Sequence, residues 1–270
     1  MIKFFRKIRY DLMNQNKTTK YFKYAIGEIT LVVIGILIAL QINNWNEERK
    51  DRIAENIALS NLELDIEEGI RALQVHLKSQ EIWIGDCIAI LKHLEEGKGF
   101  LGQDNLFRQI NDLLVRSTSG QANTTFETLK STGKLDLIRN EDLKKELVLY
   151  YNNIQDFSNN TTNNNTNLVD LLINPVLINY TIFQSHDFTD KLKAWWPKAG
   201  TINYQMQKTD HLQEILENNL SNDYSLLKLL NVINFRLLLS SIQKEEALDI
   251  VQKSEQLLDA VKMELKSFNP

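Results

Sequence analysis

The sequence predicts an all-α fold: a single N-terminal transmembrane helix followed by an extracytoplasmic antiparallel helical bundle with long coiled-coil-like helices. An apolar run at 24–42 follows a basic N-terminus, and apolar residues recur at steps of three and four over most of the remaining chain. Only 10 glycines and 3 prolines interrupt the 270 residues. We expect a basic cytoplasmic arm (1–23), a membrane helix (24–44) and a periplasmic bundle (45–270).

The composition is that of an ordinary folded protein. Apolar residues make up 43% of the chain and charged residues 24%, which excludes a disordered chain. The single cysteine, Cys87, excludes an intramolecular disulfide framework and a Cys-based zinc cluster. Because Cys87 neighbours the apolar face of its predicted helix, we expect it to be a buried small hydrophobe, with an intermolecular disulfide as the alternative.

The distribution of charge favours a membrane span at the apolar run. Residues 1–23 have seven basic groups and one acidic group, a net charge of 7 − 1 = +6, whereas residues 24–270 have 24 − 34 = −10. A helix over 24–42 is roughly 28 Å long at about 1.5 Å per residue, close to the roughly 30 Å of the hydrocarbon core. The excess of Lys and Arg before the run predicts a cytoplasmic N-terminus with the remainder outside the cytoplasm, which for a bacterial inner membrane is the periplasm.

The run is expected to remain in the mature protein as an anchor. A cleavable signal peptide has a shorter apolar region and a small-x-small cleavage site, and the exit at 39–45 has no such site. Aromatic residues lie at both ends of the run, as in the aromatic belts of membrane proteins. We therefore expect Tyr21, Tyr24 and Trp45 to be membrane-interface anchors.

Three residues of the run are candidates for contacts between membrane helices. Glu28 lies at or just inside the cytoplasmic edge, where its carboxylate either extends toward the headgroups near Lys23 or contacts a partner helix. Gly35 and Ala39 form a small-xxx-small pair that allows two helices to approach closely. Together these residues favour a homo-oligomer or a protein partner within the envelope.

Three N-terminal segments have a distinctive sequence: MIKFFRKIR at 1–9, YAIGE at 24–28 and VVIGILIALQINNWNE at 32–47. They closely resemble a family of membrane proteins of unknown function that is abundant in Bacteroidota. The segment FETLKSTGKLDLIR at 126–139 has a weaker similarity to the same family. The resemblance implies one membrane span and a helical domain beyond it, and it implies no activity.

Long amphipathic helices are predicted beyond the membrane, near the 3.5-residue period of coiled coils. The first has its apolar stripe at Leu59, Leu62, Ile66, Ile70, Leu73, Leu77, Ile84, Ile88 and Leu91. No residue forces a break between the membrane helix and this helix, so the two can be continuous. The last, near 223–268, has its stripe at Leu226, Leu230, Ile233, Leu237, Leu248, Val251, Leu258 and Leu265. Lys228 and Arg236 make this last helix too costly as a second membrane span, so we expect a core helix.

Shorter elements connect the long helices. Residues 97–102 are expected to form a turn, and a short helix follows near 104–116, burying Leu106, Ile110 and Leu113 or Leu114. Thr124 or Thr125 is the expected cap of another short helix, which Gly133 closes in the left-handed conformation.

Asn140 is the expected N-cap of a third long helix, with apolar positions at Leu143, Leu147, Tyr150 or Tyr151, Ile154 and Phe157. This helix either passes through the Asn/Thr-rich patch 159–167 toward Leu168 and Leu172 or gives way to a flexible loop there. Pro175 and Pro197 bracket the least regular part, 174–208.

Few residues suggest chemistry. The four histidines (His76, His93, His186 and His211) lack metal-site spacing, and we expect His76 and His93 to be solvated or to cap helices. Glu63, Asp65, Glu67 and Glu68 are interpreted as a solvated surface rather than an acid–base pair. Of the adjacent Trp195 and Trp196, either one is an exposed contact for a partner or the pair packs against the end of the bundle.

No Gly-rich phosphate loop or nucleophile elbow occurs in the sequence. We therefore expect no enzyme activity, no metal and no cofactor, and no nucleic acid as a partner, since the basic arm is suited to the lipid bilayer. The favoured function is a non-enzymatic scaffold or interaction module of the cell envelope. The alternative is a sensor-type ligand-binding domain. A sensor would have to signal through a membrane partner, because the 23 cytoplasmic residues are too few for an output domain.

Overall fold

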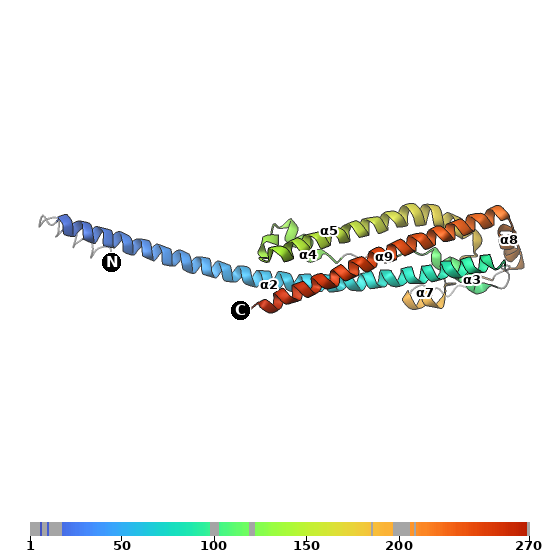
Figure 1. Ribbon diagram of the computed structural model, residues 1–270, viewed down its shortest axis with the longest axis horizontal. Helices are drawn as coiled ribbons and strands as arrows, with labels where there is room; N and C mark the ends of the chain where they lie inside the picture. Colours follow the sequence, from blue (N-terminus) through green and yellow to red (C-terminus); the bar gives the residue numbers. More distant parts are fainter. Residues whose placement is uncertain are drawn as a thin grey trace. The chain divides into compact units, whose positions relative to one another are not determined.

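A computed structural model describes residues 6, 10, 18–97, 103–118, 122–184, 186–196, 206–207 and 209–268, with side chains for all of these except 18–21 and 24 (Figure 1). The described residues form helices and irregular segments without a strand, so the all-α prediction is confirmed. The chain divides into two compact units, Met1–Ile57 and Ala58–Pro270. Most of the predicted basic arm, the side chains of Tyr21 and Tyr24, most of the turn at 97–102 and Pro197 lie outside the described residues.

The first unit contains the beginning of α2 (Thr18–Glu95), including the whole predicted membrane run. Its apolar side chains are exposed on all sides of the helix, from Ile26 (61% exposed) to Ile42 (61%). By length and composition, two of the described helices are suited to cross a membrane: α2 from Ala25 onward and α9 (Asp223–Ser267). The most apolar window of α2 has no buried residue, whereas part of the corresponding window of α9 is buried.

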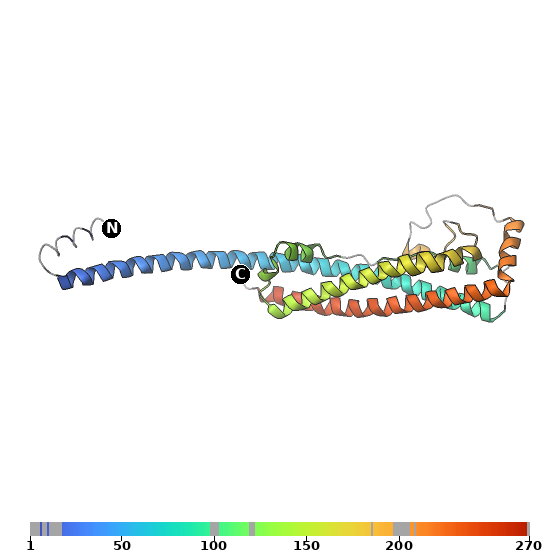
Figure 2. The same ribbon diagram turned by 90° about the horizontal axis from the view of Figure 1, so that it is seen from above.

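The second unit is built on three long helices that lie side by side in both views (Figures 1 and 2). They are α2 from Ala58 onward, α5 (Glu141–Asn164) with its continuation η2 (Asn165–Ile173), and α9. The amide of Gln80 on α2 donates to Gln243 on α9 (2.9 Å), while Asn140 before α5 donates to Glu264 (2.7 Å). Early residues of α5 thus meet late residues of α9, so α9 is antiparallel to its neighbours, as predicted.

Short helices connect the long ones: α3 (Asp104–Leu113), α4 (Thr124–Ser131), η1 (Leu135–Leu137), α6 (Asn174–Leu177), η3 (Ile178–Tyr180), α7 (Asp190–Trp195) and α8 (Asp210–Leu220). Helix α3 buries Leu106, Ile110 and Leu113 as predicted but ends at Leu113 rather than near 116. The described part of 174–208 is more regular than predicted, because α6 directly continues η2 and has Pro175 in its first turn.

The predicted face of α9 lies beside the most buried one: Leu237, Val251, Leu258 and Leu265 only flank the core. Its buried stripe alternates strictly between steps of three and four: Leu229, Ile233, Arg236, Ser240, Gln243, Ala247, Ile250, Ser254, Leu257 and Val261. Of the predicted stripe only Ile233 belongs to it, while Leu237 and Leu258 are half-buried and Leu248 is exposed. The middle of the buried stripe is occupied by small and polar residues. A prediction based on apolar residues alone therefore chooses the adjacent face of the helix.

Helix α2 repeats this pattern. Its innermost stripe is Leu59, Leu62, Ile66, Gly69, Leu73, His76, Gln80, Trp83, Cys87 and Ile90. The predicted stripe is correct as far as Leu73. Beyond it the prediction is wrong, because Ile84 is half-buried and Ile88 is 40% exposed. The continuous helix from Thr18 also confirms that the apolar run joins the bundle helix without a break.

The Asn/Thr-rich patch is helical, which decides between the two alternatives. Beyond Asn164 the chain forms the π-helical segment η2, in which each turn contains more residues than an α-helical turn. The buried positions therefore advance by four residues at each step, through Thr161, Asn165, Val169 and Ile173. The expected Leu168 and Leu172 are displaced from this face, and Leu172 is 53% exposed.

Local capping signals were partly correct. Asn140 caps α5, its side chain accepting from the backbone N–H of Leu143 (3.1 Å). Gly133 closes α4 at φ +67°, with backbone bonds from Lys134 to Leu129 (2.8 Å) and from Gly133 to Lys130 (3.2 Å) that form a Schellman motif. The prediction of Thr124 or Thr125 as the cap is wrong, because Asp65 of α2 accepts the backbone N–H of Thr125 (2.7 Å).

Gly133→Ala is expected to destabilise the protein by about 1 kcal/mol, because an L-residue in the left-handed region places Cβ close to the following carbonyl oxygen. Gly85→Ala is the matched control: Gly85 lies inside α2 with no atom within 4 Å of an added Cβ, so a gain of about 0.5–1 kcal/mol is expected. Chemical denaturation of the two variants measures both changes in the free energy of unfolding, the expected loss and the expected gain. Equal effects would contradict the turn assignment.

Candidate functional site

Buried polar residues divide the core of the second unit. One apolar cluster extends from Ala58 to Leu73 on α2 and a second begins at Ile82, with corresponding divisions on α5–η2 and α9. Between the clusters lie eight polar residues, all less than 9% exposed, that we name the central polar layer: His76, Ser79, Gln80, Ser117, Thr161, Asn165, Ser240 and Gln243. The layer thus joins all three long helices and the segment that follows α3.

Hydrogen bonds connect much of the central polar layer. The Nδ1 atom of His76 lies 3.2 Å from the hydroxyl of Ser117, and the side-chain amide of Asn165 donates to the Ser117 carbonyl (2.8 Å). Gln80 Nε2 lies 3.2 Å from His76 Nε2 and also donates to Gln243. This pattern assigns the imidazole proton to Nδ1, since Nε2 faces an amide donor.

His76 is therefore not solvated, and the prediction made for it is wrong. The side chain is fully buried, and burial lowers its pKa from 6.5 to about 4. The neutral imidazole is thus the form present at neutral pH, held in place by its two neighbours. It makes an edge-on contact with Phe157 (5.5 Å between ring centroids), at the margin of the adjoining apolar cluster.

Arg236 lies fully buried beside this layer. Its guanidinium stands 4.4 Å from the ring centroid of Trp83, and Nη2 donates to the carbonyl of Val115 (3.0 Å). The Nε and Nη1 atoms have no acceptor within the described part of the chain. Burial lowers the pKa of Arg236 to about 10, so the group remains a cation at neutral pH.

A second unexpected feature is a pair of buried carboxyl groups, Asp86 on α2 and Asp112 on α3. Asp112 accepts from both the backbone N–H (3.0 Å) and the hydroxyl of Thr189, which favour its ionised form. Burial raises the pKa of both groups, and repulsion by Asp112 raises that of Asp86 further. Asp86 is therefore the protonated member, and its carboxyl donates to Asp112.

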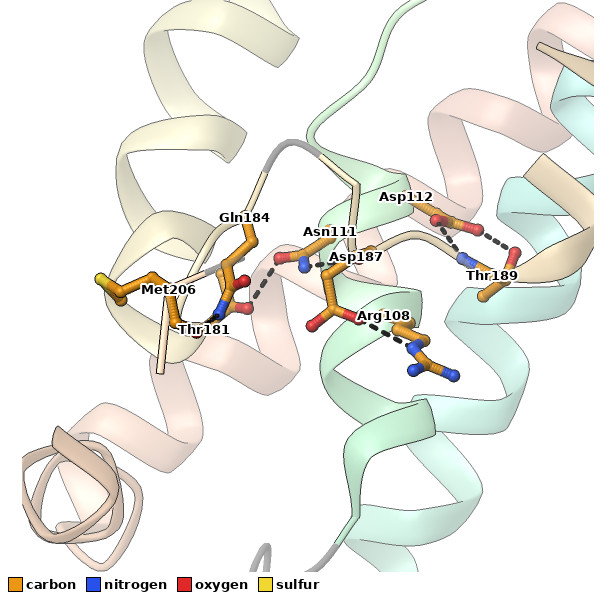
Figure 3. A network of polar contacts seen from close by, with 8 residues as sticks. All are labelled: Arg108, Asn111, Asp112, Thr181, Gln184, Asp187, Thr189 and Met206. Carbon is orange, nitrogen blue, oxygen red and sulfur yellow. Dashed lines mark hydrogen bonds and ion pairs between the residues drawn. The ribbon is translucent and has the colours of Figure 1, made fainter. Parts of the chain in front are cut away.

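Asp112 belongs to a network that fastens the segment after η3 to α3 (Figure 3). Arg108 forms an ion pair with Asp187 (2.8 Å), and the amide of Asn111 donates to the Asp187 carbonyl (2.8 Å). The hydroxyl of Thr181 donates to the side-chain oxygen of Asn111 (2.7 Å). These bonds satisfy backbone and side-chain groups of an irregular segment, so we assign the network a structural role.

Asp86→Asn is expected to remove the fall in stability between about pH 7 and 8, a range above the folded pKa values of His76 (about 4) and Asp112 (about 6). Because the folded pKa is raised, the native state retains a proton that the unfolded chain loses near pH 4. Stability therefore falls as the pH rises toward about 8. Denaturation midpoints at pH 5, 7 and 9 test this, with the exposed Asp142→Asn as the control. An unchanged slope in Asp86→Asn would contradict the buried pair.

The residues predicted for membrane contacts lie on the first unit. Glu28 is partly exposed, while Gly35 and Ala39 are exposed, and an added Cβ at Gly35 meets nothing within 4 Å. Trp45, the predicted interface anchor, is 65% exposed. These side chains therefore remain accessible to a lipid or to a partner helix.

The two adjacent tryptophans differ. Trp195 is half-buried, its ring packs edge-on against Trp83 (6.5 Å between centroids) and its indole N–H donates to the Val75 carbonyl (3.1 Å). Trp195 therefore packs against the bundle, which leaves Trp196 as the candidate for an exposed contact. Trp196 is 42% exposed. Cys87 is fully buried, which confirms the expected small hydrophobe.

The acidic residues at 63–68 are only partly a solvated surface. Lys262 of α9 forms ion pairs with Glu67 (2.9 Å) and Glu63 (3.7 Å), and Asp65 holds the start of α4 as described above. Glu68 is exposed and pairs with Arg71 within the same helix (2.8 Å). Glu63, Asp65 and Glu67 thus connect α2 to other helices. Their spacing in the sequence did not indicate these contacts.

Sequence reasoning missed Arg236, Asp86 and Asp112, the residues with the least ordinary environments. A strict alternation of three and four, continued from Leu59, would have placed His76 and Gln80 on the buried stripe. No comparable signal marks Asp86 or Asp112, whose contact joins two helices. Within the described ranges, no three His, Cys, Asp or Glu side chains form a group suited to a metal ion.

Comparison with known proteins places the chain in a family. No curated protein and no solved structure matches it. DUF6090, described as a family of unknown function, matches residues 28–181, which is more than half of the 270 residues. The matched range includes the apolar run from Glu28 onward, the α2 part of the central polar layer and the buried carboxyl pair, whereas α9 follows it. The chain therefore belongs to DUF6090, a family of unknown function.

Proposed function

We propose that the protein is a single-pass bacterial inner-membrane protein whose periplasmic helical bundle is a non-enzymatic interaction module of the cell envelope. The observation that carries the proposal is the fully exposed apolar run of α2. Transfer of each large apolar side chain from water to an apolar environment is favourable by about 1.5–3 kcal/mol. Insertion of the run into a bilayer provides this free energy for all of its side chains. The basic residues before the run favour a cytoplasmic N-terminus.

Helix α9 is assigned to the bundle rather than to a second span. Its Leu229 and Ile233 are fully buried in the apolar core, and Arg236 would face hydrocarbon if the helix were inserted. One span then leaves the bundle on the opposite side from the N-terminus. The apolar character of α9 arises because its first half is apolar on two faces.

The second apolar face of α9 supports a protein partner. Its members are spaced by three, four or eight residues and are exposed: Tyr224, Leu227, Phe235, Leu238 and Ile242. We name these residues the outer stripe. Lys228, one turn after Tyr224, is the one charged residue near this face; the part of the stripe from Phe235 to Ile242 is apolar and therefore suited to pack against a copy of itself. A second copy of the chain is the partner we assign, in agreement with the small-xxx-small pair in the span.

Crosslinking in native membranes tests the homo-oligomer. Leu238→Cys in the full-length chain is expected to form a covalent dimer with a short bis-maleimide, because Cys87 is buried and does not compete. Asp249→Cys, exposed on the same helix beyond the outer stripe, is the control and is expected to remain monomeric. Monomers from both variants would overturn the self-association, and equal dimers from both would remove the assignment to the stripe.

A C-terminal reporter tests the topology separately. Alkaline phosphatase fused after residue 270 is expected to be active and a fluorescent reporter that folds only in the cytosol to remain dark. The opposite result would place the bundle in the cytoplasm and overturn its periplasmic role.

A sensor-type ligand-binding domain is the second candidate. The central polar layer favours it, because polar residues at the inner positions of a bundle reduce its stability and so ease rearrangement. Thermal stabilisation of the full-length protein by a periplasmic small molecule other than a simple monovalent anion would support this function over a scaffold.

A further inference from the structure

Arg236 stands within a group of buried hydrogen-bond donors that lack acceptors. Within the described residues, no partner is present for Nε and Nη1 of Arg236, the indole N–H of Trp83, Nε2 of Gln243 or the hydroxyl of Ser240. The only buried acceptor without a partner on the same stripes is Oε1 of Gln80. All of these side chains are at most 1% exposed, so bulk water does not reach them.

The antiparallel register brings these groups together. Gln80 of α2 is bonded to Gln243 of α9. One turn further along α2 is Trp83, and because α9 is antiparallel, the residue opposite it is Ser240, one turn before Gln243. The next step places Cys87 level with Arg236, whose guanidinium extends back over the Trp83 ring. The cation, the indole and the hydroxyl therefore occupy adjoining positions where α2 faces α9.

The charge of Arg236 is uncompensated. Cys87 is its one electrostatic neighbour, and burial raises the pKa of that thiol to about 12, which keeps it neutral. Asp86 is adjacent in the sequence but is protonated and bonded to Asp112. The internal segments outside the described residues of the bundle, 98–102, 119–121, 185, 197–205 and 208, contain no Asp or Glu.

A buried cation without a counter-charge is strongly unfavourable. Water molecules would satisfy the free N–H groups but would leave the charge in place. An anion satisfies both, because it accepts hydrogen bonds and neutralises the guanidinium. The excess of donors over acceptors also favours an anion over a polar neutral ligand.

We propose that Arg236, Trp83 and Ser240 bind one small monovalent anion in the core of the bundle, a halide or the carboxylate of a very small organic acid. A single positive charge selects a monovalent ion, and the surrounding buried side chains limit its size. The proposal concerns the bundle alone and holds whether the protein is a scaffold or a sensor.

The full-length protein in detergent, exchanged into sodium gluconate, tests the proposal. Replacing gluconate by chloride, bromide or formate at constant ionic strength is expected to raise the unfolding midpoint saturably. A concentration 100 times the dissociation constant corresponds to a rise of roughly 5–10 °C. A response to halides alone identifies an inorganic ion as the ligand, and a stronger response to formate identifies a carboxylate.

Arg236→Met is expected to remove the anion dependence, whereas Arg71→Met, at an exposed arginine of α2, is expected to retain it. Identical midpoints of the wild-type protein in gluconate and in all three anions would overturn the proposal. Should Arg236→Met fail to fold, crystals of the wild-type protein grown in bromide decide the question. An anomalous peak beside Arg236 and Trp83 supports the site, and its absence overturns it.

Discussion

Introducing two arginines into the apolar run (Val33→Arg with Leu37→Arg) is expected to release the full-length protein from the membrane. Each arginine near the centre of a membrane helix costs about 2.5–3.5 kcal/mol, so the pair lowers the insertion equilibrium by roughly three to five orders of magnitude. Both positions are exposed in the first unit, so the substitution leaves the core of the bundle unchanged. The fraction that resists alkaline carbonate extraction measures the effect.

Asp51→Arg is the matched control, because it adds an arginine to the same helix at an exposed position beyond the apolar run. This variant is expected to fractionate as the wild-type protein does. If the double variant also resisted extraction, the run would not be the anchor, and both the inner-membrane location and the single-pass topology would be lost.

Trp83→Ala is expected to have the largest effect on the stability of the bundle. The indole is 1% exposed, packs edge-on against Trp195 and lies beneath the guanidinium of Arg236. Truncating a buried aromatic residue costs about 3–5 kcal/mol, and a desolvated cation–π contact adds about 2 kcal/mol. The sum approaches the whole stability of many domains, so we expect partial unfolding at 25 °C.

Trp196→Ala provides the comparison within the same residue type. Its side chain is 42% exposed, so a loss of about 1 kcal/mol or less is expected. Urea denaturation followed by circular dichroism measures both variants in the same detergent. Similar losses for the two would show that Trp83 is not the centre of this cluster.

Membership of DUF6090 gives these experiments wider use. The matched segment includes Trp83, His76 and the carboxyl pair, whereas Arg236 and the outer stripe lie on α9, beyond it. The anion site and the proposed dimer surface therefore depend on a helix that the family match does not cover. Experiments on this chain are needed before either is extended to other members.

Local signals in the sequence were sufficient for the long helices and for two of the caps. The helical class, the long helices near their observed bounds, the Asn140 cap and the left-handed Gly133 follow from interactions within a few residues. Leu59 to Leu73 was placed on the correct face because that part of the core is apolar and periodicity reports it directly.

The sequence by itself determined the helical elements and the exposed apolar run, because backbone hydrogen bonds, caps and side-chain periodicity act over one or two turns. Tertiary structure alone decided which face of α9 is buried, since Arg236 lies over Trp83 and Gln243 accepts from Gln80 only when α9 packs against α2. It likewise placed Asp86 against Asp112. Polar groups become buried when a distant helix supplies their partners, and spacing along one helix does not encode that pairing.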